Sequence, residues 1–258
     1  MIFSDYCIGD ETKTNDVFSF TIVPYDNWFD NLKNTINMIS KTDIKKKRKI
    51  EDRLMKYLKD KRLFHVNFIV NERKGITRRE NVDEKQVVST MLENTVKMLD
   101  EWVINTPSNA DYFRKIKKKL AVIKTEMQRK EPNYKIFRDT MLLTLLAGYI
   151  CYVIVREAKP EIVGWFSDRD KMVDVYSGAA ADFFHLNYHG LCEKHGIIAG
   201  ATKIYVGIPT CDENGKMWYD ELVRILISRR NYNYAMAGSW ISKALRISRC
   251  ALVTSVRI

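Results

Sequence analysis

The chain has 258 residues, of which 46% are hydrophobic and 29% charged, with only 5 Pro and 11 Gly. This composition excludes disordered, collagen-like and low-complexity proteins and favours one globular domain, which at this length can bury a full hydrophobic core. Forty-three Lys and Arg against 32 Asp and Glu give a net charge of +11, which favours an anionic partner such as nucleic acid.

The first half of the chain begins with two β-rich stretches joined by a polar turn. Such a pattern predicts a hairpin, and further apolar periodicities predict helices and strands along the chain. We expect strands at Ile2–Ile8, Val17–Val23 and Leu63–Asn71, and helices at Asp26–Ser40, Val82–Trp102 and Asp111–Lys130.

The second half alternates between helix and strand. After the apolar stretch Met141–Val155 we expect a strand at Glu161–Ser167, a helix at Ala179–His195 and a strand at Thr202–Ile208. This alternation predicts a mixed α/β fold with a helical insertion, over residues 1–225 as one domain.

The stretch Met141–Val155 is the one segment that suggests a membrane. It has fifteen residues and contains Thr144 and Gly148, whereas a membrane span needs about 20 apolar residues. We therefore expect a buried helix and a cytoplasmic protein, with membrane association kept as an alternative. The N-terminal residues lack the basic start and apolar run of a secretory signal, and the five scattered cysteines form no zinc or disulfide pattern.

Two basic stretches are candidates for holding a phosphate backbone. One contains Lys45, Lys46, Lys47 and Arg48, and the other contains Lys117, Lys118 and Lys119. Apolar residues at helical spacing interrupt both, so the alternative is a solvated helix face without a ligand.

The last part of the chain has no Asp or Glu after Glu221. Residues 226–258 also lack a clear helical or strand period, so we treat them as a basic tail outside the domain. Two interpretations stay open: a genuine basic tail, or a carboxyl end read in a shifted frame from about Leu226.

Carboxylates lie in or just after two predicted strands. Asp5 is in the first strand, and Asp168 and Asp170 follow the apolar strand that ends at Ser167. Oxygen ligands of this kind suit Mg²⁺, and metal ions held at such a place can promote phosphodiester hydrolysis. The alternative is that these acids cap a loop and a helix.

The histidines are weaker candidates. His185 and His189 are four residues apart on a predicted helix but lack the HExxH pattern, so we interpret them as structural. No cysteine has a partner that would make it a nucleophile.

The segments FSDYCIGDE, VFSFTIVP, EIVGWFSDRDKM and MWYDELVRI resemble a large family of bacterial and phage proteins with an expected ribonuclease-H-like fold. The resemblance implies a mixed sheet flanked by helices and a divalent-metal nuclease scaffold. Asp5 would match the family's first acid, and Asp168 and Asp170 its second group. The family's last acid belongs to a Pro-Asp pair, for which this chain has Leu226-Ile227.

These observations lead to one functional hypothesis and two alternatives. The hypothesis is a Mg²⁺-dependent nuclease, or a degenerate relative, with Asp5, Asp168 and Asp170 as metal ligands and catalytic residues. The alternatives are a non-catalytic nucleic-acid-binding protein and an interaction protein. The sequence indicates neither DNA nor RNA as the partner, and no oligomeric state.

Overall fold

The computed structural model describes residues 1–9, 15–39, 60–70, 76–78, 80–207, 211–213 and 215–227. Its strands are β1 (Ile2–Cys7), β2 (Asp16–Ile22), β3 (Phe64–Val70), β4 (Ile162–Ser167) and β5 (Lys203–Gly207). Its α-helices are α1 (Phe29–Ile39), α3 (Glu84–Asn105), α4 (Ala110–Met127), α5 (Tyr134–Ala158), α6 (Lys171–Lys194) and α7 (Asp220–Ile227), and short 3₁₀ turns lie at Pro107–Asn109 and Ala199–Ala201.

The five strands form one sheet in the order β3-β2-β1-β4-β5. β2 is antiparallel to both β1 and β3, whereas β4 is parallel to both β1 and β5. A hairpin thus supplies one half of the sheet, and helical crossovers supply the other half, as parallel strands require. The predicted α/β class, the initial hairpin and the two later strands are confirmed.

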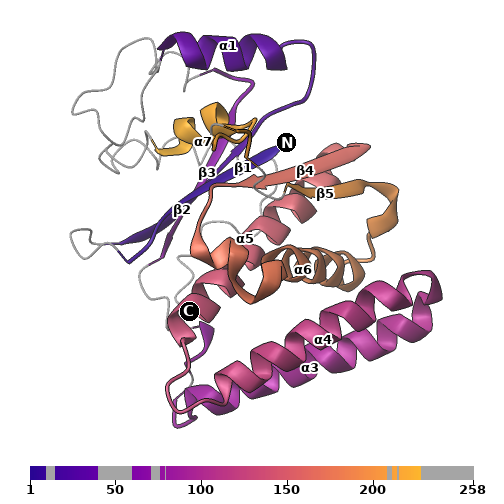
Figure 1. Cartoon of the computed structure of the whole chain (residues 1–258). Coiled ribbons are helices and arrows are strands. Elements are labelled where there is room, and N and C mark those ends of the chain that lie inside the picture. Colours follow the sequence, from indigo (N-terminus) through magenta and orange to yellow (C-terminus); the bar gives the residue numbers. More distant parts are fainter. Residues whose placement is uncertain are drawn as a thin grey trace.

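The molecule is layered (Figure 1). α1 and α7 lie on one face of the sheet, α5 and α6 on the other, and the antiparallel pair α3–α4 lies beyond α6. Because side chains alternate along a strand, Phe3 and Phe166 face α7, whereas Ile2 and Trp165 face α5 and α6. A third cluster joins α3 and α4 to α6 through residues such as Leu99, Leu120 and Phe183.

α5 contains the apolar stretch that raised the membrane question. Among the described residues it is the one helix that is long and apolar enough to cross a bilayer. In this structure Leu143, Ala147 and Cys151 are buried in the core against the sheet and α6. The expected core helix therefore accounts for the apolar run.

α6 differs from its prediction at its start. It begins at Lys171, eight residues before the predicted Ala179, but Tyr176, Ser177 and Gly178 have left-handed backbone angles with φ of 56°, 57° and 71°. Left-handed conformation is costly for residues with a Cβ and breaks helical periodicity. The apolar periodicity therefore predicted only the part of α6 that follows this kink.

The predicted boundary between domain and tail falls inside α7, which runs to Ile227. Residues 228–258, which hold most of the proposed tail, lie outside the described residues, as do Lys45, Lys46, Lys47 and Arg48.

Candidate active site at the ends of β1 and β4

Asp5 and Asp168 come from neighbouring parallel strands. The register pairs Phe3 with Phe166 and Ser4 with Ser167, and the Asp168 N–H then donates to the Ser4 carbonyl over 2.9 Å. Asp5 and Asp168 each come directly after the last residue pair of this register, Ser4 and Ser167. Both follow the alternation of Phe3 and Phe166, so the two acids belong to the α7 side of the sheet.

Asp5 is only 3% exposed, which is unusual for an aspartate. On the same face Asp5 pairs with Ser19 of β2, and Ser19 pairs with Asn67 of β3. A row of oxygen-bearing side chains therefore crosses the sheet from β3 to the end of β4. Ser19 and Asn67 were not predicted as site residues, although each lies between two apolar residues of its strand.

A chain of hydrogen bonds on the opposite face fixes the same strand ends. Ser4 Oγ and Tyr6 Oη are 2.6 Å apart, and Tyr6 Oη and Ser167 Oγ are also 2.6 Å apart. Trp165 Nε1 donates to Ser4 Oγ over 2.9 Å, and Ser167 Oγ donates to the Asp168 carbonyl over 2.8 Å.

The two ends of this chain determine its direction. An indole N–H can only donate and a backbone carbonyl can only accept, so Ser4 donates to Tyr6 and Tyr6 donates to Ser167. Each hydroxyl donates one hydrogen bond and accepts another. Every donor and acceptor in this series of hydrogen bonds, from Trp165 to the Asp168 carbonyl, therefore has a partner.

Burial raises the pKa of Tyr6 above its ordinary value. The hydrogen bonds with Ser167 and Ser4 lower this pKa, and the nearby charges of Asp5 and Asp168 raise it further. The phenol therefore keeps its proton at neutral pH, as the direction of the hydrogen-bond chain requires.

Tyr219 holds the end of β4 from the α7 side. Its hydroxyl donates to the Ser167 carbonyl over 3.0 Å, and its ring lies 6.3 Å from that of Phe3. The backbone at Ser167 and Asp168 is thus held from both faces of the sheet. Sites held by packed, hydrogen-bonded supporting residues keep their geometry during catalysis.

Asp170 has a different local role from Asp168. It is the N-cap of α6, and its Oδ1 accepts from the Met172 N–H over 3.1 Å. Asp168 Oδ1 instead accepts from the Arg169 N–H over 2.8 Å, in the loop between β4 and α6. Asp5 and Asp168 therefore follow the last paired residues of β1 and β4, whereas Asp170 caps a helix.

The donor set at the strand ends fits Mg²⁺ in kind. This cation is commonly held by one or two carboxylates together with water and substrate phosphate. Within the described residues no group of three or more His, Cys, Asp and Glu side chains is arranged to hold a metal. The oxygen ligands on this face are therefore the carboxylates of Asp5 and Asp168, with the Ser19 hydroxyl and the Asn67 amide in the same row.

The lysines of α4 proposed for phosphate binding differ from one another. Lys117 pairs with Asp100 of α3, and Lys119 Nζ lies 2.7 Å from Asp182 of α6. Lys118 is exposed. Two of the three cations thus join helices within the molecule, and Lys118 points to solvent.

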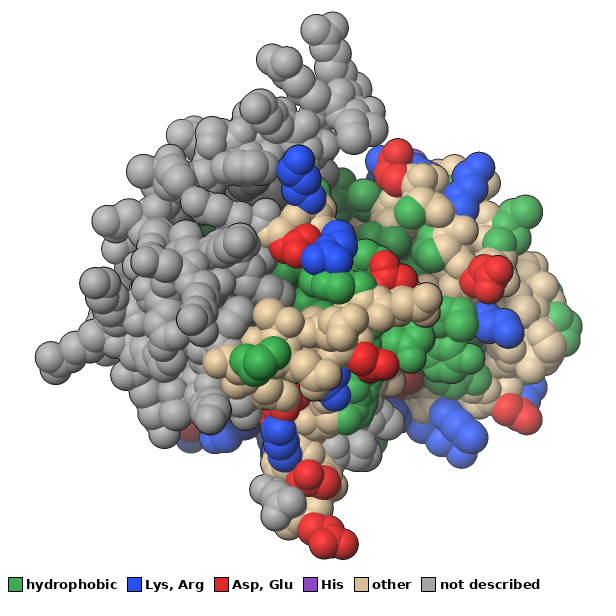
Figure 2. All heavy atoms as spheres, turned by 90° about the horizontal axis from the view of Figure 1, so that it is seen from above, with side chains coloured by type: hydrophobic (Ala, Val, Ile, Leu, Met, Phe, Trp, Pro, Cys, Tyr) green, Lys and Arg blue, Asp and Glu red, His purple; other side chains and the backbone are tan. Residues whose placement is uncertain are grey.

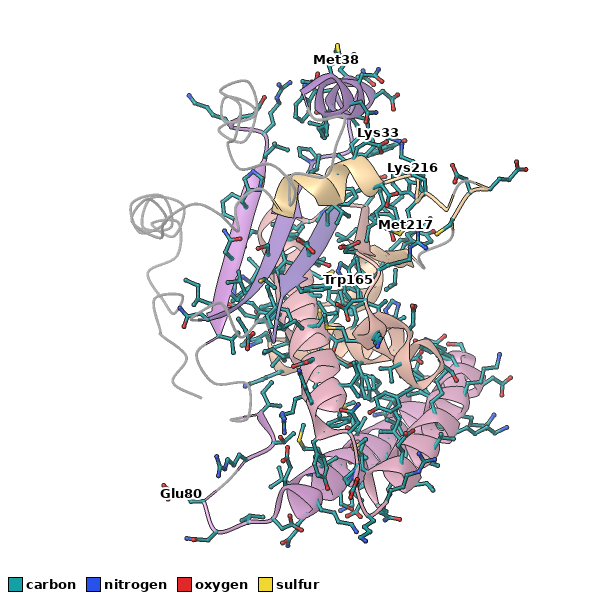
Figure 3. All side chains as sticks on the ribbon, turned by 60° about the vertical axis from the view of Figure 1, so that its left-hand side comes forward. Lys33, Met38, Glu80, Trp165, Lys216 and Met217 are labelled. Atoms are coloured by element: carbon teal, nitrogen blue, oxygen red, sulfur yellow. The ribbon has the colours of Figure 1, made fainter. Side chains whose placement is uncertain are left out.

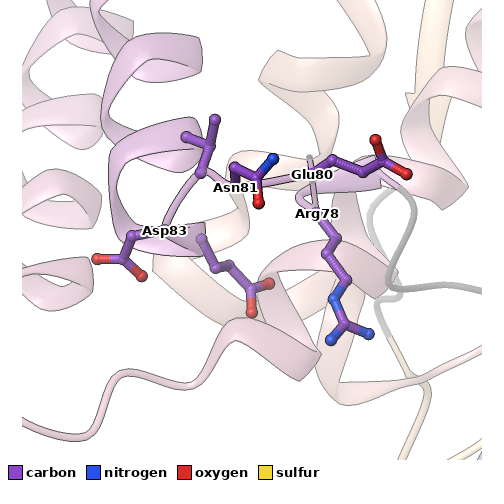
Figure 4. A pocket seen from close by; sticks show the side chains of 6 residues that line it. Arg78, Glu80, Asn81 and Asp83 are labelled. Atoms are coloured by element: carbon purple, nitrogen blue, oxygen red, sulfur yellow. The ribbon is translucent and has the colours of Figure 1, made fainter.

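A hollow lies away from Asp5 and Asp168, in the segment that leads into α3 (Figure 4). Arg78, Glu80, Asn81, Val82, Asp83 and Glu84 line it. Asp83 caps α3, and Glu84 accepts from Thr77 and pairs with Arg138. Because two of its acids serve local structure, we place the candidate site at the ends of β1 and β4.

No protein-family model, curated protein or solved structure matches this chain.

Proposed function

We propose that this protein is a divalent-metal-dependent phosphodiesterase acting on nucleic acid, with a ribonuclease-H-like fold. The observation that carries the proposal is the placement of Asp5 on β1 and of Asp168 directly after the parallel β4, with the Asp168 N–H bonded to the Ser4 carbonyl. The mixed sheet with β1 at its centre and helices on both faces agrees with the fold that the sequence resemblance implies.

Asp5 and Asp168 would hold the cation, and Asp170 would remain primarily a helix cap. A bound Mg²⁺ supplies a Lewis acid for a phosphoryl oxygen and lowers the pKa of a coordinated water. The residues of this chain position the two carboxylates: the Ser4–Tyr6–Ser167 hydrogen bonds hold the backbone at Asp168, and Tyr219 holds it from the other face.

The net charge of +11 supports an anionic substrate. Exposed Lys118 is a proposed backbone contact. We propose a cytoplasmic location, which is supported by the packing of α5 into the core.

The test is cleavage of labelled single- and double-stranded DNA and RNA with Mg²⁺ and with EDTA. We expect Asp168→Ala and Asp5→Asn to lose at least about a hundredfold in rate, since each removes a ligand of the cation that stabilises the transition-state charge. Unchanged Mg²⁺-dependent cleavage by Asp168→Ala would overturn the proposal. Binding without cleavage by the wild type would favour the non-catalytic alternative.

Asp170→Ser is a matched control, because serine also caps helices well. Its carboxylate already accepts the Met172 N–H, so we expect this variant to keep most of the activity. A loss as large as that of Asp168→Ala would instead identify Asp170 as a third ligand.

A further inference from the structure

On the α7 side of the sheet, several large side chains of β4, β5 and the segment before α7 are exposed. Tyr205 is 57% exposed, Trp218 is 47% exposed, and Ile162 is also exposed. The register pairs Gly164 with Tyr205 and Phe166 with Gly207, so Tyr205 and Phe166 lie on the same face as Asp168. Figure 2 shows this side from above, with hydrophobic side chains at the surface among scattered charges on its described part.

Two glycines let an aromatic ring lie flat on these strands. A Cβ at Gly207 would be 2.3 Å from Phe166 Cδ1, and one at Gly164 would be 2.7 Å from Phe166 Cε2. Either methyl group would displace the Phe166 ring. The glycines therefore keep space for Phe166 between Asp168 and the exposed rings.

Trp218 continues this aromatic surface from the segment before α7. Its ring meets Phe166 edge to face, with centroids 5.0 Å apart and an angle of 82°. Phe166 in turn stacks on Phe3 at 5.4 Å. The strand positions of Phe3 and Phe166 are two residues before Asp5 and Asp168, so the aromatic surface lies directly behind the two acids.

Cations border the aromatic rings. Lys33 of α1 donates to the Trp218 carbonyl over 2.7 Å, and its ammonium lies 5.6 Å from the centre of the Trp218 ring. Lys203 is exposed at the start of β5, and Arg169 is exposed directly after Asp168. Lys216, which Figure 3 shows beside Lys33, is paired with Glu221, so its charge is balanced within the molecule.

We propose that Trp218 and Tyr205 form a stacking platform for the bases of a single-stranded nucleic acid whose phosphates lie near Asp5 and Asp168. This inference rests on the proposed function and adds the strandedness of the substrate. Unpaired bases present their faces to aromatic rings, whereas a duplex keeps its bases stacked internally. Lys33, Lys203 and Arg169 supply the positive charge that a phosphate backbone requires.

The test measures binding in EDTA, where metal-dependent cleavage does not occur. Short fluorescein-labelled oligothymidylate and oligouridylate serve as probes, and anisotropy reports the Kd. We expect Trp218→Ala and Tyr205→Ala each to weaken binding roughly 5- to 150-fold, the range that corresponds to the loss of one base–aromatic stack. Trp218→Phe keeps a stacking surface and should recover most of the affinity.

Val122→Ala is the control for removal of an exposed apolar side chain, because Val122 is exposed on α4. It should leave the affinity unchanged. Unchanged affinity in both aromatic variants would overturn the platform, as would a change in oligomeric state without a change in affinity, which would identify the face as a contact between copies.

The two proposals fail separately. Asp168→Ala should lose cleavage and keep single-strand binding, so cleavage that persists in this variant contradicts the nuclease but not the platform. A wild type that cleaves but binds no single strand more tightly than the matching duplex contradicts the platform and leaves the nuclease standing.

Discussion

The two faces of the sheet carry similar side chains in opposite environments. Trp165 on the α5–α6 face is 1% exposed and stacks on Phe184 at 4.8 Å, whereas Trp218 on the α7 face is 47% exposed. Tyr6 is buried within a closed hydrogen-bond chain, whereas Tyr205 is 57% exposed. One face is packed and holds the strand ends in place, whereas the other carries exposed aromatic rings.

The largest difference should appear when the two tryptophans are truncated. We expect Trp165→Ala to lower the free energy of unfolding by about 3–5 kcal/mol, because it leaves a cavity in a packed core. Trp218→Ala should cost less than about 1 kcal/mol, since its ring is half exposed. Urea unfolding of both variants measures the contrast, and equal losses would mean that the two faces are equally packed.

The pH dependence of stability tests the packing of α6 against α3 and α4. Burial lowers the pKa of His185 on α6 to about 4, and the charge of His189 lowers it further, while Asp182 acts in the opposite direction. Other groups also lie where α6 packs on α3 and α4. Tyr112 and Lys119 of α4 donate to Asp182 of α6. Trp102 of α3 contacts the His189 ring and donates to Glu193.

The sign of this pH effect follows from the lowered pKa. His185 is neutral when folded but titrates near 6.5 when unfolded, so the unfolded state binds more protons between these values. The free energy of unfolding should therefore fall by up to about 3 kcal/mol as the pH drops from about 6.5 to 4. His185→Gln should flatten this dependence in urea titrations, and an unchanged slope would mean that other groups cause it.

The smallest expected effect concerns the hydroxyl of Tyr6. Tyr6→Phe leaves the Ser4 hydroxyl without an acceptor and Ser167 without a donor, which should cost about 1–2 kcal/mol. Tyr205→Phe is the matched change on the open face and should be neutral. Unfolding measurements on both variants sharpen the comparison, and a neutral Tyr6→Phe would show that the hydrogen-bond chain does not stabilise the strand ends.

Much of the local structure could be predicted because apolar periodicity reflects burial directly. The hairpin of β1 and β2, the α3–α4 break at Pro107 and the strand that ends before Asp168 are all present. The kink in α6 was not predicted. Of its three left-handed residues only Gly178 is of a type that favours this conformation, and Tyr176 and Ser177 give no such indication.

The candidate site was less predictable than the elements that carry it. Asp5 and Asp168 were found because acids stand out at the end of apolar strands, but Asp170 was grouped with them although it caps α6. The pairing of Lys117 with Asp100 and of Lys119 with Asp182 was also missed. The spacing of lysines along one helix does not indicate which acidic side chains of a neighbouring helix will pair with them.

The amino-acid sequence by itself determined the α/β class, most of the elements and the candidate acids, because period-2 and period-3.6 patterns and isolated carboxylates are local features. Only the tertiary structure decided that β1 lies beside β4, and with it that Asp5 and Asp168 become neighbours although 163 positions separate them in the chain. The order of strands depends on which helices cover which face, and no local pattern encodes that choice.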